Sequence, residues 1–220
     1  MFVAGSFIRG EATAYSDLDR VVVYEALPNA HRESFRFEGF PVEVFVHDSE
    51  TLNYFFHEVD RPTAVPSLAQ MVREGIEVPA STALSRSLKA LAIAVIENGP
   101  PRLTEEDDRN RRYIITDLLD DMRDPRSYAE LIETGAQLCP AIADYYLRTK
   151  GLWSAKGKSI PRALERVSPE FNKRYCEASE SLFRKGNPAA VIAMAEELLK
   201  SNGGLMFEGY RRDAPAAWRK

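Results

Sequence analysis

Residues 2–23 read FVAGSFIRGEATAYSDLDRVVV and combine a short apolar segment, a Gly-Ser turn and two aspartates before a run of valines. A short apolar strand leads into a tight turn at Gly5 and Ser6, whose backbone N–H groups would face an anion such as a phosphate. Asp17 and Asp19 follow, two positions apart at the start of a valine-rich strand. Side chains with this spacing project from the same face of a strand, so the two carboxylates converge. Converging carboxylates repel each other unless a cation lies between them, and Mg²⁺ prefers such oxygen ligands.

This segment resembles the signature of the DNA polymerase beta-like nucleotidyltransferase superfamily, and above all its small antibiotic-modifying and minimal members. The matching positions are Gly5-Ser6, Arg9-Gly10, Ala12, Ser16 and Asp17-Leu18-Asp19. That family takes a third carboxylate from a later strand, and Glu43 in the apolar run 40–46 matches it. The resemblance implies an α+β fold built on a small mixed β-sheet. It also implies Mg²⁺ as the metal and ATP or another nucleoside triphosphate as co-substrate.

The resemblance assigns a role to each of these residues. Asp17, Asp19 and Glu43 would be the metal-binding and catalytic acids. The triphosphate would be held by Gly5, Ser6, Arg9 and Ser16. A hydroxyl of the acceptor would then attack the α-phosphorus and release pyrophosphate.

The chain departs from the family pattern at two places. Arg20 stands where the family has an apolar residue after the second aspartate, and it is expected to pair with a neighbour or to lie at an exposed edge. The motif also begins almost at Met1, without the helix that precedes the first strand in that family, so the native start is expected upstream or the domain trimmed. These departures keep a catalytically inactive, nucleotide-binding module as an alternative.

Every part of the motif also has a plain structural explanation. Gly-Ser is a common turn, and Asp-Leu-Asp occurs by chance in many loops. A strand glutamate such as Glu43 is often only solvated at a sheet edge. The joint pattern of turn, Arg-Gly pair, serine, aspartate pair and later acid is much more specific than any of its parts.

Composition narrows the class of acceptor. The chain has 220 residues, 45% of them apolar, which suits one large or two small domains with a real core. Lys and Arg number 29 against 33 acids, for a net charge of −4, and such a balance does not favour strong non-specific binding of nucleic acid. A small-molecule hydroxyl acceptor is therefore favoured over a nucleic-acid primer.

The cysteines and the lack of long apolar runs bear on the cellular compartment of the protein. No run approaches the roughly 18 apolar residues of a membrane span, and no signal peptide is visible. Cys139 and Cys176 lack the spacing of metal ligands and make a poor disulfide framework. Together these features favour a reducing cytoplasm.

The hydrophobic period changes once along the chain, near Pro79. Before it, the pattern predicts strands at 1–4, 19–25, 33–38 and 40–47, a hairpin turn at 36–40, and helices at 49–57 and 65–74. After it, an apolar stripe predicts a helix from Leu84 to Ile96, and further helices are expected at 104–123, 128–149, 159–166, 168–184 and 187–200. The sequence thus predicts a catalytic core over 1–80 and a helical substrate-binding bundle over 81–220.

The helix predicted at 104–123 carries a cluster of acids on one side, made of Asp117, Asp120, Asp121 and Asp124. The simplest explanation is a solvated face, relieved by neighbouring arginines. In aminoglycoside-modifying relatives, however, a carboxylate of the helical domain deprotonates the attacking hydroxyl, and an acidic wall holds the cationic antibiotic. On that resemblance Asp117 and Asp121 are the preferred candidates for the general base.

The segment 150–158 contains two glycines among three lysines. Lys156 and Lys158 lie on a mobile basic loop that would reach a triphosphate. A solvated loop between helices has the same composition and is the commoner case.

Two further possibilities stay open. The acceptor could be a protein, as in bacterial toxin–antitoxin pairs, although the Arg-then-His motif of their helical ribonuclease toxins does not occur in 81–220. The resemblance also makes a homodimer plausible, because some relatives build the site across two chains.

Overall fold

The computed structural model describes residues 1–214 and 216, and it divides the chain into two compact units, Met1–Pro101 and Arg102–Lys220. The division falls later than the boundary predicted after residue 80. The helix α5 (Ala83–Glu97) packs on α4 (Ser67–Glu74) and so belongs to the first unit. A helical period alone does not reveal against which unit an amphipathic helix packs. The predicted bundle range, 81–220, also includes Pro215 and residues 217–220, which lie outside the described residues.

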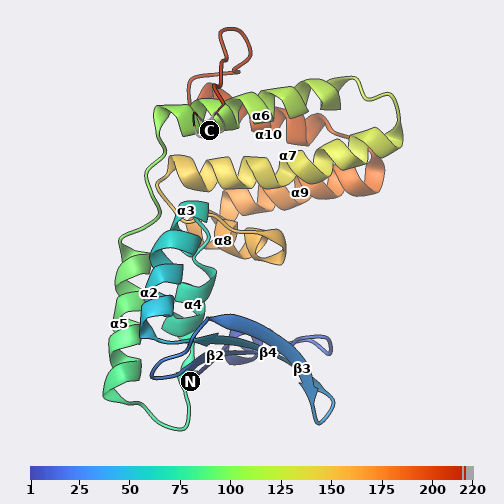
Figure 1. The fold of residues 1–220 in the computed structure, drawn as a ribbon. Coiled ribbons are helices and arrows are strands. Elements are labelled where there is room, and N and C mark those ends of the chain that lie inside the picture. Colours follow the sequence, from blue (N-terminus) through green and yellow to red (C-terminus); the bar gives the residue numbers. More distant parts are fainter. Residues whose placement is uncertain (215, 217–220) are drawn as a thin grey trace. The chain divides into compact units, whose positions relative to one another are not determined.

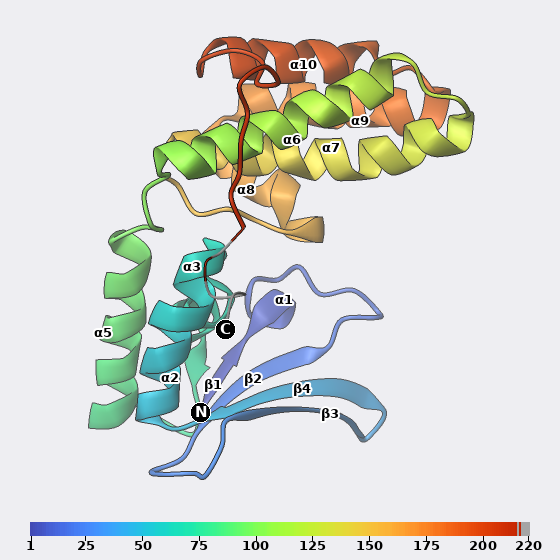
Figure 2. The same cartoon turned by 45° about the horizontal axis from the view of Figure 1, so that its top comes forward.

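The first unit is built on a mixed sheet, as the α+β prediction requires (Figures 1 and 2). Its strands are β1 (Phe2–Ala4), β2 (Leu18–Val23), β3 (His31–Phe37), β4 (Phe40–His47) and β5 (Ile76–Glu77). They lie in the order β3-β4-β2-β1-β5, with β2 and β4 parallel and the other pairs antiparallel. In the printed views β3 forms one outer edge of this sheet. The two-residue β5 escapes a sequence search because it is too short to show a period.

A tight hairpin joins β3 to β4, as predicted. Phe37 pairs with Phe40, and the two residues between them, Glu38 and Gly39, both have positive φ, at 49° and 87°. Positive φ at both central positions defines a type I′ turn, whose twist matches that of the flanking strands. The turn fixes which residues of β3 lie opposite Glu43.

The first unit adds helices to this sheet, of which α5 lies outermost and packs on α4 (Figure 1). After α1 (Gly5–Ile8) they are α2 (Ser49–Tyr54), the π-helix η1 (Phe55–Asp60), α3 (Arg61–Thr63), α4 and α5. The helix predicted at 49–57 is thus α2 continued by a π-helical turn, and its Phe56 is fully buried, as a core aromatic should be. Gly5 and Ser6, predicted as a turn, form the start of the single-turn helix α1.

Asp60 joins two of these helices. The residue before α4 is Pro66, which has no side-chain acceptor to cap the helix. Asp60 replaces it, because its Oδ2 accepts hydrogen bonds from the backbone N–H groups of Leu68 (2.8 Å) and Ala69 (3.2 Å). A buried carboxylate from another helix therefore satisfies the free N–H groups of α4.

The second unit is helical, as predicted. Its helices are α6 (Glu105–Arg123), α7 (Tyr128–Thr149), the 3₁₀ turn η2 (Gly157–Ser159), α8 (Ile160–Val167), α9 (Pro169–Lys185) and α10 (Ala189–Lys200). Thr104 caps α6 in a capping box with Asp107. Buried side chains such as Leu119, Leu138 and Leu182 form its core. Across the described ranges of both units, every helix is too short or too polar to cross a membrane.

The segment after α10 returns along α6. The Arg112 guanidinium donates to the carbonyl oxygens of Gly203 (2.7 Å) and Gly204 (2.9 Å). The Tyr210 ring stacks on Tyr113, with centroids 3.9 Å apart and an interplanar angle of 6°. These contacts tie the end of the described chain to the bundle.

Candidate active site

Asp17, Asp19 and Glu43 come together on the first unit. Asp19 of β2 lies directly beside Glu43 of β4 in the parallel register, so both side chains leave the same face of the sheet. Asp17 precedes β2 by one residue and follows the same alternation. One carboxylate oxygen from each residue lies within 4.8 Å of the other two, and all three residues are half-buried.

The donor set fits a small hard cation. Oxygens bound to one Mg²⁺ at about 2.1 Å are separated by at most about 4.2 Å. We call Asp17, Asp19 and Glu43 the acidic triad. One carboxylate oxygen from each lies within 4.8 Å of the other two, so a small rotation of the side chains would bring them to that separation. Three carboxylates are also ligands of the type that Mg²⁺ and Mn²⁺ select.

The backbone of Gly5 lies close to the carboxylate of Asp19. Ala4 pairs with Asp19 across β1 and β2, which brings the next residue, Gly5, against the Asp19 carboxylate. Gly5 has φ +78°, and a Cβ added there would overlap Asp19 Oδ2. Only glycine provides both this backbone conformation and this approach.

Arg9 and Ser16 have structural partners beside the triad. The Arg9 guanidinium forms ion pairs with Glu11, at 3.1 Å, and with Glu74 of α4. Ser16 Oγ accepts a hydrogen bond from the backbone N–H of Thr13 at 2.8 Å and so stabilises the turn before Asp17. The predicted contacts of Arg9 and Ser16 with phosphate, like those of Gly5 and Ser6, remain predictions.

Two residues of β3 flank Glu43 that sequence reasoning missed. The Arg32 guanidinium forms an ion pair with Glu43 Oε1, and Ser34 Oγ donates to the same oxygen at 3.4 Å. Both belong to the face of β3 that Glu43 shares, because Ser34 is paired with Glu43 in the register. The alternation along β3 could have revealed them once the hairpin turn had fixed that register.

Arg20 does not lie at an edge, so that alternative was wrong, and its pairing with a neighbour stays a prediction. Its strand, β2, is internal, with β4 on one side and β1 on the other. Alternation directs the Arg20 side chain to the face opposite Asp19. Among the described residues its Nε is buried without a hydrogen-bond partner.

The remaining predicted site residues belong to the second unit. Asp117 and Asp121 are exposed on α6, and the neighbouring Asp120 pairs with Arg123 at 2.5 Å. Lys156 and Lys158 are exposed on the segment that leads into α8. Because the acidic triad belongs to the other unit, the roles of all four residues stay predictions.

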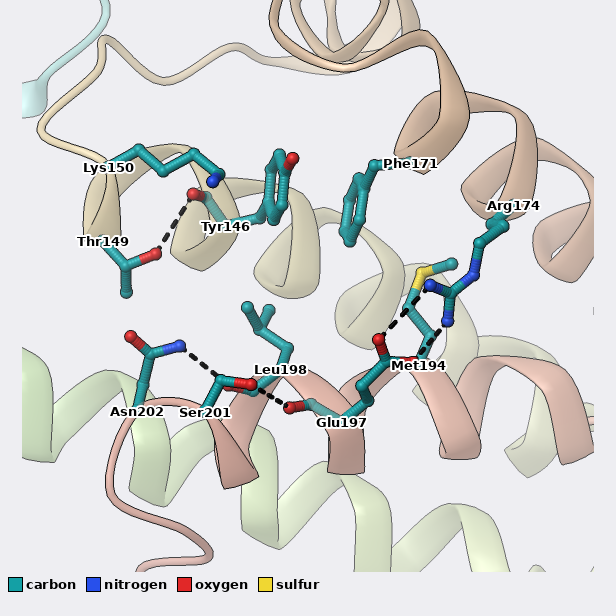
Figure 3. A pocket seen from close by; sticks show the side chains of 10 residues that line it. All are labelled: Tyr146, Thr149, Lys150, Phe171, Arg174, Met194, Glu197, Leu198, Ser201 and Asn202. Atoms are coloured by element: carbon teal, nitrogen blue, oxygen red, sulfur yellow. Dashed lines mark hydrogen bonds and ion pairs between the residues drawn. The ribbon is translucent and has the colours of Figure 1, made fainter.

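The second unit also contains a cavity of about 340 Å³ between α7, α9 and α10 (Figure 3). The rings of Tyr146 and Phe171 stack face to face, with centroids 3.6 Å apart, and Lys150 Nζ lies 4.9 Å from the Tyr146 centroid. Arg174 reaches across to Glu197, at 2.5 Å, on the other wall. Sequence reasoning missed this cavity because its walls come from three helices distant in sequence.

Comparison with known proteins gives a fold likeness only. No protein-family model matches the chain, and no curated protein matches it. Among solved structures, the chain is similar to a nucleotidyltransferase-like protein from Exiguobacterium sibiricum 255-15, with 14% sequence identity and a TM-score of 0.44. The match covers 84% of this chain and 62% of that protein, so the chain spans less than two thirds of the other protein's length.

Proposed function

We propose that this chain is a metal-dependent nucleotidyltransferase that transfers a nucleoside monophosphate, with ATP as donor, to a hydroxyl of a small molecule. The observation that carries this proposal is the convergence of Asp17, Asp19 and Glu43 on one face of the sheet, with Gly5 packed against Asp19. The sequence motif assigns Gly5, Asp17 and Asp19 to one site, and the proximity of the three acids supports the proposal.

The acidic triad would hold the divalent cation. When bound, such a cation would supply positive charge beside the phosphate oxygens of the nucleotide. Gly5 keeps the backbone close to the carboxylates, since any side chain at this position would push Asp19 away. Arg9 is held next to the same turn by Glu11 and Glu74, and there its guanidinium would contact the β- and γ-phosphates.

The acceptor would bind to the second unit. The cavity beside Tyr146 has a volume within the range of small-molecule sites, and it combines an apolar floor at Met194 and Leu198 with a charged rim. The acids of α6 offer an alternative surface for a cationic acceptor, and Asp117 and Asp121 are the candidates to take the proton from its hydroxyl.

Pyrophosphate release from Mg²⁺-ATP tests this function across a panel of aminoglycosides, lincosamides and neutral sugars. We expect release that depends on one acceptor class and is lost in Asp17→Asn and Asp19→Asn. Glu33→Gln is the matched control, because Glu33 is an exposed acid of β3 on the face opposite Glu43. Release in the wild type that survives in Asp19→Asn would contradict the proposal, and transfer of label to a protein would redirect it to a protein acceptor.

A further inference from the structure

We propose that Arg32 is an internal competitor of the divalent cation, which holds one oxygen of Glu43 and lowers the affinity of the acidic triad for metal. This inference rests on the proposed function, in which Asp17, Asp19 and Glu43 bind a cation. It adds a residue from the edge strand β3 that the sequence motif does not contain.

The Glu43 carboxylate has two partners on the neighbouring strand β3. Arg32 Nη2 and Ser34 Oγ both engage Oε1 of the Glu43 carboxylate. Glu43 is also the member of the triad that lies between β3 and β2 in the sheet, with Ser34 on one side and Asp19 on the other. A cation that binds the triad therefore meets a carboxylate already shared with a guanidinium.

Arg32 is held in this position by a second contact. Its guanidinium carbon lies 5.1 Å from the centroid of the Phe45 ring, and Phe45 is two residues beyond Glu43 on the same face of β4. The arginine thus lies over two neighbouring side chains of one strand.

Electrostatics gives the direction of the effect. With Arg32 in place the three carboxylates and the guanidinium carry a net charge of about −2, and without it about −3. A divalent cation is attracted more strongly to the second arrangement, because it no longer faces a positive neighbour. If Arg32 only oriented Glu43, its removal would weaken metal binding, so the sign of the change separates the two roles.

The exposure of Arg32 and Glu43 indicates that the guanidinium can move away from the carboxylate when a cation binds. The Arg32 side chain is 60% exposed, whereas that of Glu43 is 14% exposed. Such half-exposed ion pairs contribute at most about 1 kcal/mol, so a bound cation can displace the guanidinium toward solvent. Arg32 therefore weakens metal binding without preventing it.

Titration of the purified chain with Mn²⁺, followed by calorimetry or by the signal of free Mn²⁺ in electron paramagnetic resonance, tests this inference. We expect Arg32→Gln to bind Mn²⁺ roughly three- to fivefold more tightly than the wild type, as expected for the loss of one exposed ion pair. Arg32→Lys keeps the charge and should bind as the wild type does.

Arg36→Gln is the matched control. Arg36 belongs to the same strand and the same face, but it donates to the Gly39 carbonyl at 3.0 Å instead of to Glu43. Its replacement removes the same charge and should leave the Mn²⁺ affinity unchanged. The gain in Arg32→Gln should also shrink in high salt, because exposed charges are screened over about 8 Å at physiological ionic strength.

An unchanged or weaker affinity in Arg32→Gln would overturn the inference, as would an equal gain in Arg36→Gln. A wild-type chain that binds no Mn²⁺, or an Asp19→Asn variant that binds as well as the wild type, would instead refute the cation site of the proposed function and the competition with it. Thermal unfolding of each variant verifies that the affinity is measured on folded protein, and β3 is exposed enough to tolerate these changes.

Discussion

Gly5 lies so close to Asp19 that a single added carbon at position 5 would occupy the space of the Asp19 carboxylate oxygen. Two features of the sheet create this contact. The Ala4–Asp19 pairing sets the register, and the positive φ of Gly5 turns the chain back over the carboxylate. A replacement of Gly5 is thus expected to act directly on the Asp19 carboxylate.

Gly5→Ala should therefore abolish Mn²⁺ binding by the triad, because the new Cβ displaces Asp19. It should also cost about 1–2 kcal/mol through the strained backbone alone. Gly10→Ala is the control, since Gly10 has φ +70° with open space around it and so suffers the backbone strain without the overlap. Mn²⁺ titration and thermal unfolding of both variants measure the two effects separately, and equal loss of Mn²⁺ binding in the two variants would contradict this account.

Asp60→Ala should destabilise the first unit by about 1–3 kcal/mol, because two buried N–H groups of α4 lose their acceptor. Asp60→Asn keeps an acceptor oxygen and should cost less. Urea unfolding at neutral pH compares the two variants. Equal stability of Asp60→Ala and wild type would show that α4 does not need this cap.

Asp60 should also make the stability of the folded chain depend on pH. Burial raises the pKa of Asp60 above its ordinary value of 3.8, so the folded state holds the proton more tightly than the unfolded state. The resulting stability is present below pH 3.8 and is lost as the pH rises through the folded pKa. The loss of stability in Asp60→Asn relative to the wild type should therefore shrink as the pH rises through the folded pKa, and a difference that stays constant with pH would exclude the effect.

His47 should make the stability of the folded chain depend on pH in the opposite sense to Asp60. Burial lowers the pKa of His47 below 6.5, and its ring packs edge-on against Phe55 with centroids 4.8 Å apart. The unfolded state then binds the proton more tightly, so stability is complete above pH 6.5 and falls as the pH drops below it. Denaturation at pH 7, 6 and 5 should show a fall in the wild type that His47→Gln lacks, whereas parallel curves would assign the fall to other groups.

Tyr210→Ala should loosen the segment that returns along α6. The substitution removes both the stack on Tyr113 and the hydrogen bond from the Tyr210 hydroxyl to Asn110 Oδ1, at 2.8 Å. Tyr210→Phe retains the stack and should lose less. Hydrogen exchange at the Met206 amide, which donates to Thr116 Oγ1 at 3.0 Å, reports the change, and equal protection in all three proteins would contradict it.

The sequence predicted most elements because their signals are local. The helix signals of α6 and α9 lie within each segment, and Gly39, which adopts positive φ without strain, marks the hairpin turn. The boundary between units escaped prediction because α5 has the period of a bundle helix but packs on α4. That choice depends on tertiary contacts, which periodicity does not encode.

The proximity of Asp17, Asp19 and Glu43 could be anticipated because two of these acids belong to one motif and the third matches the later strand that the family resemblance assigns. The partners of the individual site residues could not be predicted from the sequence. Arg32 reaches Glu43 only through the register of β3, and Glu74 reaches Arg9 from a helix more than sixty positions away in the chain. The cap at Asp60 was hidden for the same reason, since it depends on the fold between two helices.

The fate of radioactive label from ATP distinguishes nucleotidyl transfer from other phosphate transfers. With [α-³²P]ATP and an acceptor identified by the panel, we expect labelled acceptor. With [γ-³²P]ATP we expect labelled pyrophosphate and unlabelled acceptor. Both signals should disappear in Asp19→Asn and persist in Glu33→Gln. Label from the γ-phosphate in the acceptor, or transfer that survives in Asp19→Asn, would show that the chain is not a nucleotidyltransferase of this kind.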